Sequence, residues 1–200
     1  MSSVHAYAVL DRVERFHGPI FSVVTDRVSM PGGGQADRDY VRHVGAVGVV
    51  PLDDDGRVLL VRQYRHPIGK VLWELPAGLV DVAGEPPPDT ARRELAEEAD
   101  LRCERLDLLL DLHTSPGFSD ELIRLFLARG LSAVPEADRF ERSDEEAELT
   151  VTWVPLDEAV AMVFRGEITN AAAVAGVLGA ARARDEEWRP LRDPETPLVR

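Results

Sequence analysis

The sequence is poor in cysteine and lacks long apolar runs. Its one cysteine, Cys103, cannot form a disulfide within the chain, which suits a reducing compartment, so we expect a cytoplasmic protein. No apolar run approaches the ~18 residues that a membrane-spanning helix needs, and the first residues do not read as a signal peptide. These absences argue against secretion and against a membrane partner.

Basic residues are also scarce. The chain has 23 Lys and Arg against 36 Asp and Glu, which gives a formal net charge of −13. Nonspecific nucleic-acid binding depends on Lys and Arg that neutralise phosphates, so we expect no nucleic-acid partner. An anionic small molecule would require local cations, which a bound metal ion and a few placed arginines could supply.

The 200 residues are enough for one good core with a small accessory piece. Loose apolar alternation over residues 7–16 and 20–28, then a Pro-Gly-Gly-Gly turn and a third strand near 40–43, predict a β subdomain over residues 1–43. We expect its exposed strand edges to favour pairing with a second copy of the chain.

Residues 44–184 have the pattern of a mixed α/β domain. Apolar runs 46–52 and 57–64 flank the turn Asp53–Gly56 and predict a hairpin covered on both faces. Further elements are predicted as strands near 73–75, 106–113, 122–128 and 149–154, a helix starting near 86–90 with Asp89 as N-cap, and helices over 156–164 and 171–183. Helices on both sides of the strands give an α/β/α sandwich. Residues 185–200 are expected to form a loose tail.

The most informative segment is Arg93–Glu98, which packs three carboxylates and one guanidinium into about two helical turns. Glu94 and Glu98 are four residues apart and share a helix face, with Glu97 beside them. Like charges so placed repel, and a buried carboxylate without a partner is costly. Hard cations such as Mg²⁺ take oxygen ligands and phosphates, so the segment predicts a metal-dependent phosphate site.

Together with Gly78 upstream, this segment resembles the Nudix box. The matches at the family's spacing are Glu85, Arg93, Glu94, Leu95, Glu97, Glu98 and Leu101. Six residues instead of five separate Gly78 from Glu85, and Asp100 replaces a glycine that would form a left-handed helix cap, a role that Asp fills less well. The resemblance implies the Nudix α/β/α sandwich and hydrolysis of a nucleoside diphosphate linked to another group.

Three further stretches are similar to the ADP-ribose pyrophosphatase subfamily: Gln63–Arg65, Trp73–Gly78 and Ser115–Glu121. This resemblance implies Mg²⁺- or Mn²⁺-dependent hydrolysis of ADP-ribose to AMP and ribose 5-phosphate, by a homodimer with exchanged N-terminal strands. Alternatives are another nucleoside diphosphate sugar such as GDP-mannose, a dinucleotide, or a module that binds ADP-ribose without hydrolysing it.

The resemblance also implies roles for single residues. The expected metal ligands are the backbone carbonyl of Ala77 and the carboxylates of Glu94, Glu97 and Glu98, with Glu148 as a further ligand. Gly78, Glu85 and Arg93 are expected to be structural. Glu98 also counts as catalytic, because its replacement by glutamine should nearly abolish turnover.

For the general base, the acidic loop Ser143–Glu148 offers Glu146 first and Glu145 second, or else is simply a solvated loop. Arg65 is the candidate for gripping the diphosphate. Glu121 would bind the terminal ribose and Phe118 would line its pocket. Arg38 is either a nucleotide contact or an exposed strand residue.

Overall fold

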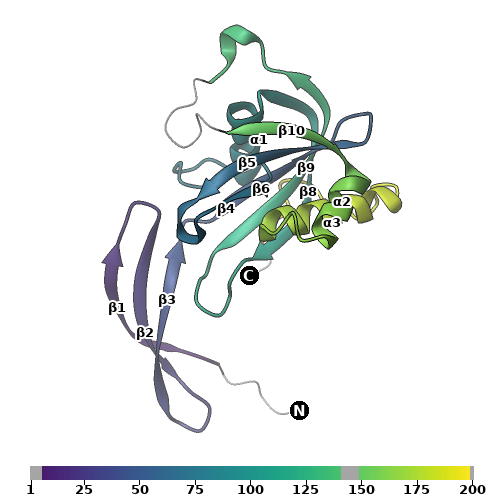
Figure 1. Cartoon of the computed structure of the whole chain (residues 1–200). Coiled ribbons are helices and arrows are strands. Elements are labelled where there is room, and N and C mark those ends of the chain that lie inside the picture. The colour runs from purple at the N-terminus through teal and green to yellow at the C-terminus, as the bar shows by residue number, and fades with distance from the viewer. Residues whose placement is uncertain (1–5, 141–148, 199–200) are drawn as a thin grey trace. The chain divides into compact units, whose positions relative to one another are not determined.

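The computed structural model describes residues 6–140 and 149–198. The chain divides into two compact units (Figure 1). The first comprises Met1–Gly45 and His113–Leu122, and the second comprises Ala46–Leu112 and Ile123–Arg200. The first unit thus includes a loop that lies far along the sequence from its strands.

The N-terminal unit is built on an antiparallel sheet of three strands in the order β1 (Val9–His17), β2 (Phe21–Ser29) and β3 (Gln35–His43). Each predicted strand is present, and the third begins earlier than its sequence pattern indicated. The loop 113–122 joins this unit through β3, because the Val41 N–H donates to the Phe118 carbonyl at 2.8 Å.

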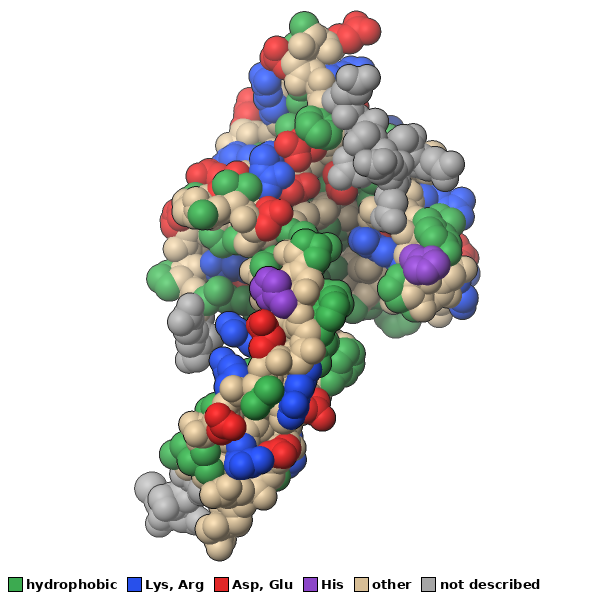
Figure 2. All heavy atoms as spheres, turned by 90° about the vertical axis from the view of Figure 1, so that its left-hand side faces the viewer, with side chains coloured by type: hydrophobic (Ala, Val, Ile, Leu, Met, Phe, Trp, Pro, Cys, Tyr) green, Lys and Arg blue, Asp and Glu red, His purple; other side chains and the backbone are tan. Residues whose placement is uncertain are grey.

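A polar network links the three strands of this sheet. The buried carboxylate of Asp26 on β2 accepts two bonds from Arg12 on β1, at 2.6 and 2.7 Å, and one from the Tyr40 hydroxyl on β3 at 3.2 Å. The hydrogen bonds from Arg12 are the main reason that the pKa of Asp26 lies below its ordinary range. Figure 2 shows basic and acidic side chains interspersed over the sheet face in view.

In its described residues the second unit has two sheets and three α-helices (Figure 1). One sheet has the order β10-β5-β6 and the other the order β7-β4-β9-β8. The strands are β4 (Ala46–Pro51), β5 (Arg57–Arg65), β6 (Lys70–Glu74), β7 (Ala77–Leu79), β8 (Leu101–His113), β9 (Leu122–Ala133) and β10 (Thr150–Pro155). The helices are α1 (Pro87–Ala99), α2 (Leu156–Phe164) and α3 (Ala171–Asp185), with 3₁₀ turns η1 (His66–Ile68) and η2 (Glu136–Asp138).

Alternating side chains divide the core of this unit into two layers. On β4, Val47 and Val49 belong to the cluster that contains Leu95 of α1. Val50 belongs instead to the cluster that contains Val177 of α3 and residues of α2. Because successive side chains of a strand point to opposite faces, the helices cover both sides of the strands, and the predicted α/β/α sandwich is confirmed.

The predicted hairpin of β4 and β5 is wrong. The turn between them closes as expected, with the Asp53 N–H donating to the Arg57 carbonyl at 3.0 Å. The strands then enter different sheets, where β4 pairs in parallel with β9, and β5 lies between β10 and β6. Their apolar faces fit this arrangement, because each strand is central in its own sheet and is covered on both sides.

Two smaller expectations also need correction. Helix α1 begins at Pro87 with Pro86 as N-cap, so Asp89 lies in the first turn, where its charge suits the helix dipole.

The segment after α3 is attached rather than loose. Arg192 and Leu108 exchange two backbone hydrogen bonds of 2.9 and 3.0 Å, and Arg124 donates to the Thr196 carbonyl at 2.8 Å.

Candidate active site

Helix α1 carries the carboxylate-rich segment and packs it against the sheet. Its apolar side chains Ala91 and Leu95 are fully buried in the core, which orients the helix. Glu94 and Glu98 lie on the covered side as well and are only 8% and 5% exposed. Two carboxylates in such a place need compensating groups, because burial of an unpaired charge is costly.

Arg93 supplies one compensating charge. Its guanidinium donates to Glu94 at 2.7 Å and to Glu97 at 3.0 Å, and it bonds Glu85 at 3.2 and 3.3 Å. Thr90 also donates to Glu85, at 2.9 Å. The bonds from Arg93 and then Thr90 lower the pKa of Glu85 and hold the preceding loop on the helix.

Strand β7 contacts the carboxylates of Glu98 and Glu94. The Ala77 N–H donates to Glu98 at 2.8 Å. At Gly78, an added Cβ would lie 2.0–2.5 Å from the carboxylate atoms of Glu94. The glycine of the box therefore leaves the space that this carboxylate occupies, and a larger residue would displace the Glu94 side chain.

The two departures from the family pattern leave this arrangement in place. Asp100 adopts the left-handed conformation, with φ of 54°, and its N–H donates to the Leu95 carbonyl at the end of α1. The six residues between Gly78 and Glu85 end at Gly84, which also has a positive φ, of 83°. A flexible residue at this point accommodates the longer loop.

The donor set suits a hard divalent cation, because it consists of carboxylate oxygens with a backbone carbonyl nearby in the sequence. Within residues 6–140 and 149–198, however, no three His, Cys, Asp or Glu side chains are already grouped as a metal site. In this arrangement Arg93 and the Ala77 N–H bind the carboxylates of the box. Glu145, Glu146 and Glu148 lie outside the described residues.

Arg65, the candidate for the diphosphate, ends β5 and forms a bidentate pair with Glu74 of β6, at 2.7 and 2.9 Å. Glu74 is buried, at 3% exposure, while Arg65 is partly exposed. Sequence reasoning gave Glu74 no role. The available signal was a carboxylate between Trp73 and Leu75 in a short apolar strand, a place where a charge needs a partner.

The remaining candidates belong to the N-terminal unit. Glu121 accepts a hydrogen bond from Thr114 and lies 3.7 Å from Nδ1 of His43. Phe118 is 60% exposed, and the exposed Arg38 donates to the Asp37 carbonyl at 2.9 Å. Sequence reasoning missed both neighbours of Glu121: Thr114 lies in the same loop, and His43 lies 78 positions earlier.

Among the helices within the described ranges, none combines the length and apolar character needed to cross a membrane.

The sandwich and its carboxylate helix define a fold of the Nudix class. A family model described as the NUDIX domain matches residues 42–175, and the chain belongs to this family. Members of the family generally need a divalent metal ion. The family and the fold predicted from the sequence are thus confirmed.

Two relatives are similar to the chain in sequence, and one solved structure shares its fold. It is 48% identical to an ADP-ribose pyrophosphatase of Mycobacterium tuberculosis, over 92% of each chain. It is 35% identical to an ADP-ribose pyrophosphatase of Bacillus subtilis, over 78% of this chain and 82% of the relative. A solved structure titled as an ADP compounds hydrolase has a similar fold, with a TM-score of 0.77 at 21% identity over 94% of this chain and 100% of the other.

Proposed function

We propose that the protein hydrolyses ADP-ribose to AMP and ribose 5-phosphate with a divalent metal ion, Mg²⁺ or Mn²⁺. The observation that carries this proposal is that all the carboxylates of the box are retained in a chain 48% identical to an ADP-ribose pyrophosphatase. Glu94 and Glu98 are buried against β7, and the glycine that makes room for Glu94 is retained. A module that only senses ADP-ribose would not need to retain this set of carboxylates.

The ligands of the metal would be the Ala77 carbonyl and the carboxylates of Glu94, Glu97 and Glu98, with Glu148 as a further ligand. When bound, the metal would neutralise the diphosphate and activate water. Arg93 would hold the carboxylates in register, because it already bonds Glu85, Glu94 and Glu97. Gly78 and Glu85 keep structural roles beside it.

Two sets of residues would hold the substrate. Arg65 would bind the diphosphate, and its buried partner Glu74 would fix the orientation of its guanidinium. Glu121 would accept a hydrogen bond from the terminal ribose. Phe118 offers an exposed ring for the lining of that pocket, and Arg38 is available for the nucleotide.

In the reaction, a water oxygen attacks one phosphorus and the bond from that phosphorus to the bridging oxygen breaks. Each product leaves as a phosphate monoester, and a base takes the proton of the water. We assign the base to Glu146, with Glu145 as the alternative. Replacing Glu146 with glutamine should lower kcat by about 10²–10⁴, while Glu145→Gln, which tests the alternative, should leave kcat near that of the original chain. An unchanged rate in Glu146→Gln would remove it from this role.

The substrate is tested by product release from ADP-ribose, GDP-mannose, NADH, FAD and diadenosine compounds, with Mg²⁺ or with a chelator. Metal-dependent AMP from ADP-ribose above all others supports the proposal. Faster cleavage of another compound would keep the hydrolase and replace its substrate. Binding of ADP-ribose without turnover would favour the sensing module.

We also infer that the protein works in the cytoplasm as a homodimer. Every residue of the edge strand β1 is exposed, including the apolar Val9, Leu10, Val13 and Phe16. An exposed apolar edge strand favours pairing with another chain. A monomeric mass by light scattering, with full activity, would contradict the dimer.

A further inference from the structure

Glu121, which we assign to the terminal ribose, lies in a loop that is bound to strand β3. The Val41 N–H donates to the Phe118 carbonyl at 2.8 Å, and the Asp120 N–H donates to the Val41 carbonyl at 3.1 Å. Within the loop, the Glu121 N–H donates to the Ser119 hydroxyl at 3.1 Å. The backbone of Glu121 is thus held in place, which leaves the direction of its side chain to be set by other groups.

The carboxylate of Glu121 receives its hydrogen bond from Thr114. The Thr114 hydroxyl, seven residues earlier in the same loop, binds Oε2 of Glu121. The imidazole of His43 faces the other oxygen, Oε1, at 3.7 Å, which is too long for a hydrogen bond. Nδ1 of His43 accepts the Gly45 N–H at 3.1 Å, so in the neutral ring this nitrogen has no hydrogen to donate. Among the described residues, Thr114 is therefore the side chain that orients this carboxylate.

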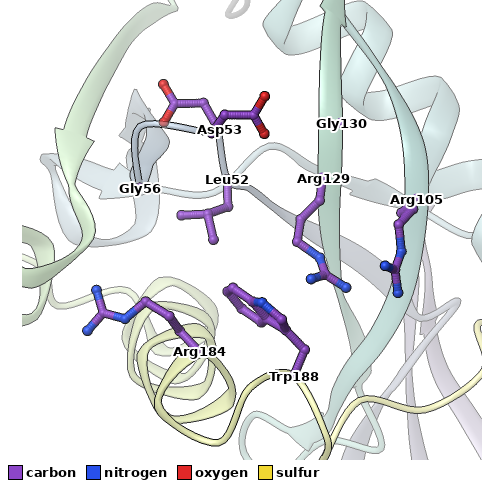
Figure 3. Close-up of a pocket in the computed structure, with 9 residues that line it drawn as sticks. Leu52, Asp53, Gly56, Arg105, Arg129, Gly130, Arg184 and Trp188 are labelled. Carbon is purple, nitrogen blue, oxygen red and sulfur yellow. The ribbon is translucent and has the colours of Figure 1, made fainter.

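Glu121 also has no Lys or Arg partner within the described part of the chain. The cavity at the end of α3 shows the contrast, because its arginines Arg129 and Arg184 have carboxylate partners (Figure 3). Arg129 donates to Asp107 at 2.7 Å. Arg184 donates to Asp157, also at 2.7 Å. A carboxylate that has one neutral donor and is 27% exposed keeps acceptor positions for the hydroxyl groups of a ligand.

We propose that Thr114 is a positioning residue for recognition of the terminal ribose, an inference that rests on the role given to Glu121 in the proposed function. Its hydroxyl would hold Oε2, so that the carboxylate presents Oε1 to the hydroxyls of the sugar. A hydroxyl that donates to a charged carboxylate forms a strong hydrogen bond, and the bond depends on the direction in which the carboxylate points. A ligand that ends at the diphosphate gains nothing from Thr114.

The test compares ADP-ribose with ADP, which lacks the terminal ribose. The full chain is titrated with each ligand by calorimetry, in chelator so that no turnover occurs. Thr114→Val keeps the shape of the side chain and removes its hydroxyl, while Thr114→Ser keeps the hydroxyl and removes the methyl group. We expect Thr114→Val to weaken ADP-ribose binding by about tenfold and ADP binding by less than about twofold, because a hydrogen bond to a charged group is lost. Thr114→Ser should recover the affinity that Thr114→Val loses.

Kinetics and a control variant complete the test. Thr114→Val should raise KM for ADP-ribose by a similar factor and leave kcat within about twofold, because the contact is made equally in the bound substrate and in the transition state. Thr152→Val, at an exposed position of β10, should change neither ligand's affinity.

Two results would overturn the proposal. One is equal weakening of ADP-ribose and ADP in Thr114→Val. The other is weak binding in Thr114→Ser with normal binding in Thr114→Val, which would show that the methyl group serves packing. The titration does not depend on turnover, so the expected binding pattern without hydrolysis of ADP-ribose would support this inference and overturn the proposed hydrolysis.

Discussion

The two helical layers of the Nudix unit each use a glycine for close approach, with different results. On the α1 side, Gly78 of β7 makes room for the carboxylate of Glu94. On the α3 side, Gly176 makes room for Leu75 and Val50, whose side-chain atoms would lie 2.6 and 3.0 Å from an added Cβ. The space left by glycine is filled by a carboxylate on the α1 side and by apolar side chains on the α3 side.

The difference shows how the same fold separates chemistry from stability. The α1 layer contains buried carboxylates held by Arg93 and by the Ala77 N–H. The α3 layer buries alanine, valine and glycine and is almost purely apolar. Changes on the first side should therefore act mainly on turnover, and changes on the second mainly on the free energy of unfolding.

The largest expected effect is on the α1 side. Glu98→Gln should lower turnover by a hundredfold or more, because it removes a charge from the expected metal ligands without changing volume. Steady-state kinetics with Mg²⁺ measure the effect, and thermal unfolding checks the fold. Glu158→Gln, on the exposed surface of α2, is the matched control. Full activity in Glu98→Gln would remove Glu98 from the metal site.

Gly78→Ala should also lower turnover, by a somewhat smaller factor than Glu98→Gln. The new methyl group would occupy the position of the Glu94 carboxylate, whose flexible side chain can move away. We expect a loss of activity of about 10²-fold, since a displacement of about 1 Å can cost this much, with only a small change in melting temperature. If the substitution lowers the melting temperature strongly and turnover only slightly, the position of Glu94 serves packing and not catalysis.

Gly176→Ala should show the opposite pattern. Its methyl group meets buried Leu75 and Val50 in a close-packed core, where overpacking costs about 1–3 kcal/mol. Denaturant unfolding should show this loss, while kcat of the folded protein stays near that of the original. A variant with normal stability and impaired kcat would contradict the proposed division of roles between the two layers.

The smallest expected effect depends on pH and tests the Glu85–Arg93 link. Hydrogen bonds lower the pKa of Glu85 below its ordinary value of 4.5, so the folded state binds fewer protons than the unfolded state in that range. The contribution of Glu85 to stability is therefore present above about pH 4.5 and is lost as the pH falls through its lower folded value.

Melting temperatures of the original chain and of Glu85→Gln should accordingly differ at pH 7 and converge as the solution is acidified. Glu136→Gln, an exposed carboxylate of η2, serves as the control. A difference that stays constant down to pH 3 would show that the carboxylate charge of Glu85 is not what binds the loop.

The sequence by itself determined the box, the strands and the sandwich, because these follow from local spacing. The i, i+4 pair Glu94 and Glu98 and the apolar stripe through Leu95 are properties of one helix. The pattern of apolar residues along each central strand likewise indicates that both of its faces are covered. The left-handed cap at Asp100 followed from its position at the end of the same helix.

Only the tertiary structure decided which strands are partners and which distant groups meet. The runs over β4 and β5 fit a hairpin or two central strands equally well, and the pairing of β4 with β9 selected the second. The pair of Arg65 with Glu74 depends on the register of β5 with β6, and the contact of Glu121 with His43 joins residues 78 positions apart; no local pattern records either. Local spacing fixes the face of an element, while the packing of all elements together fixes its neighbours.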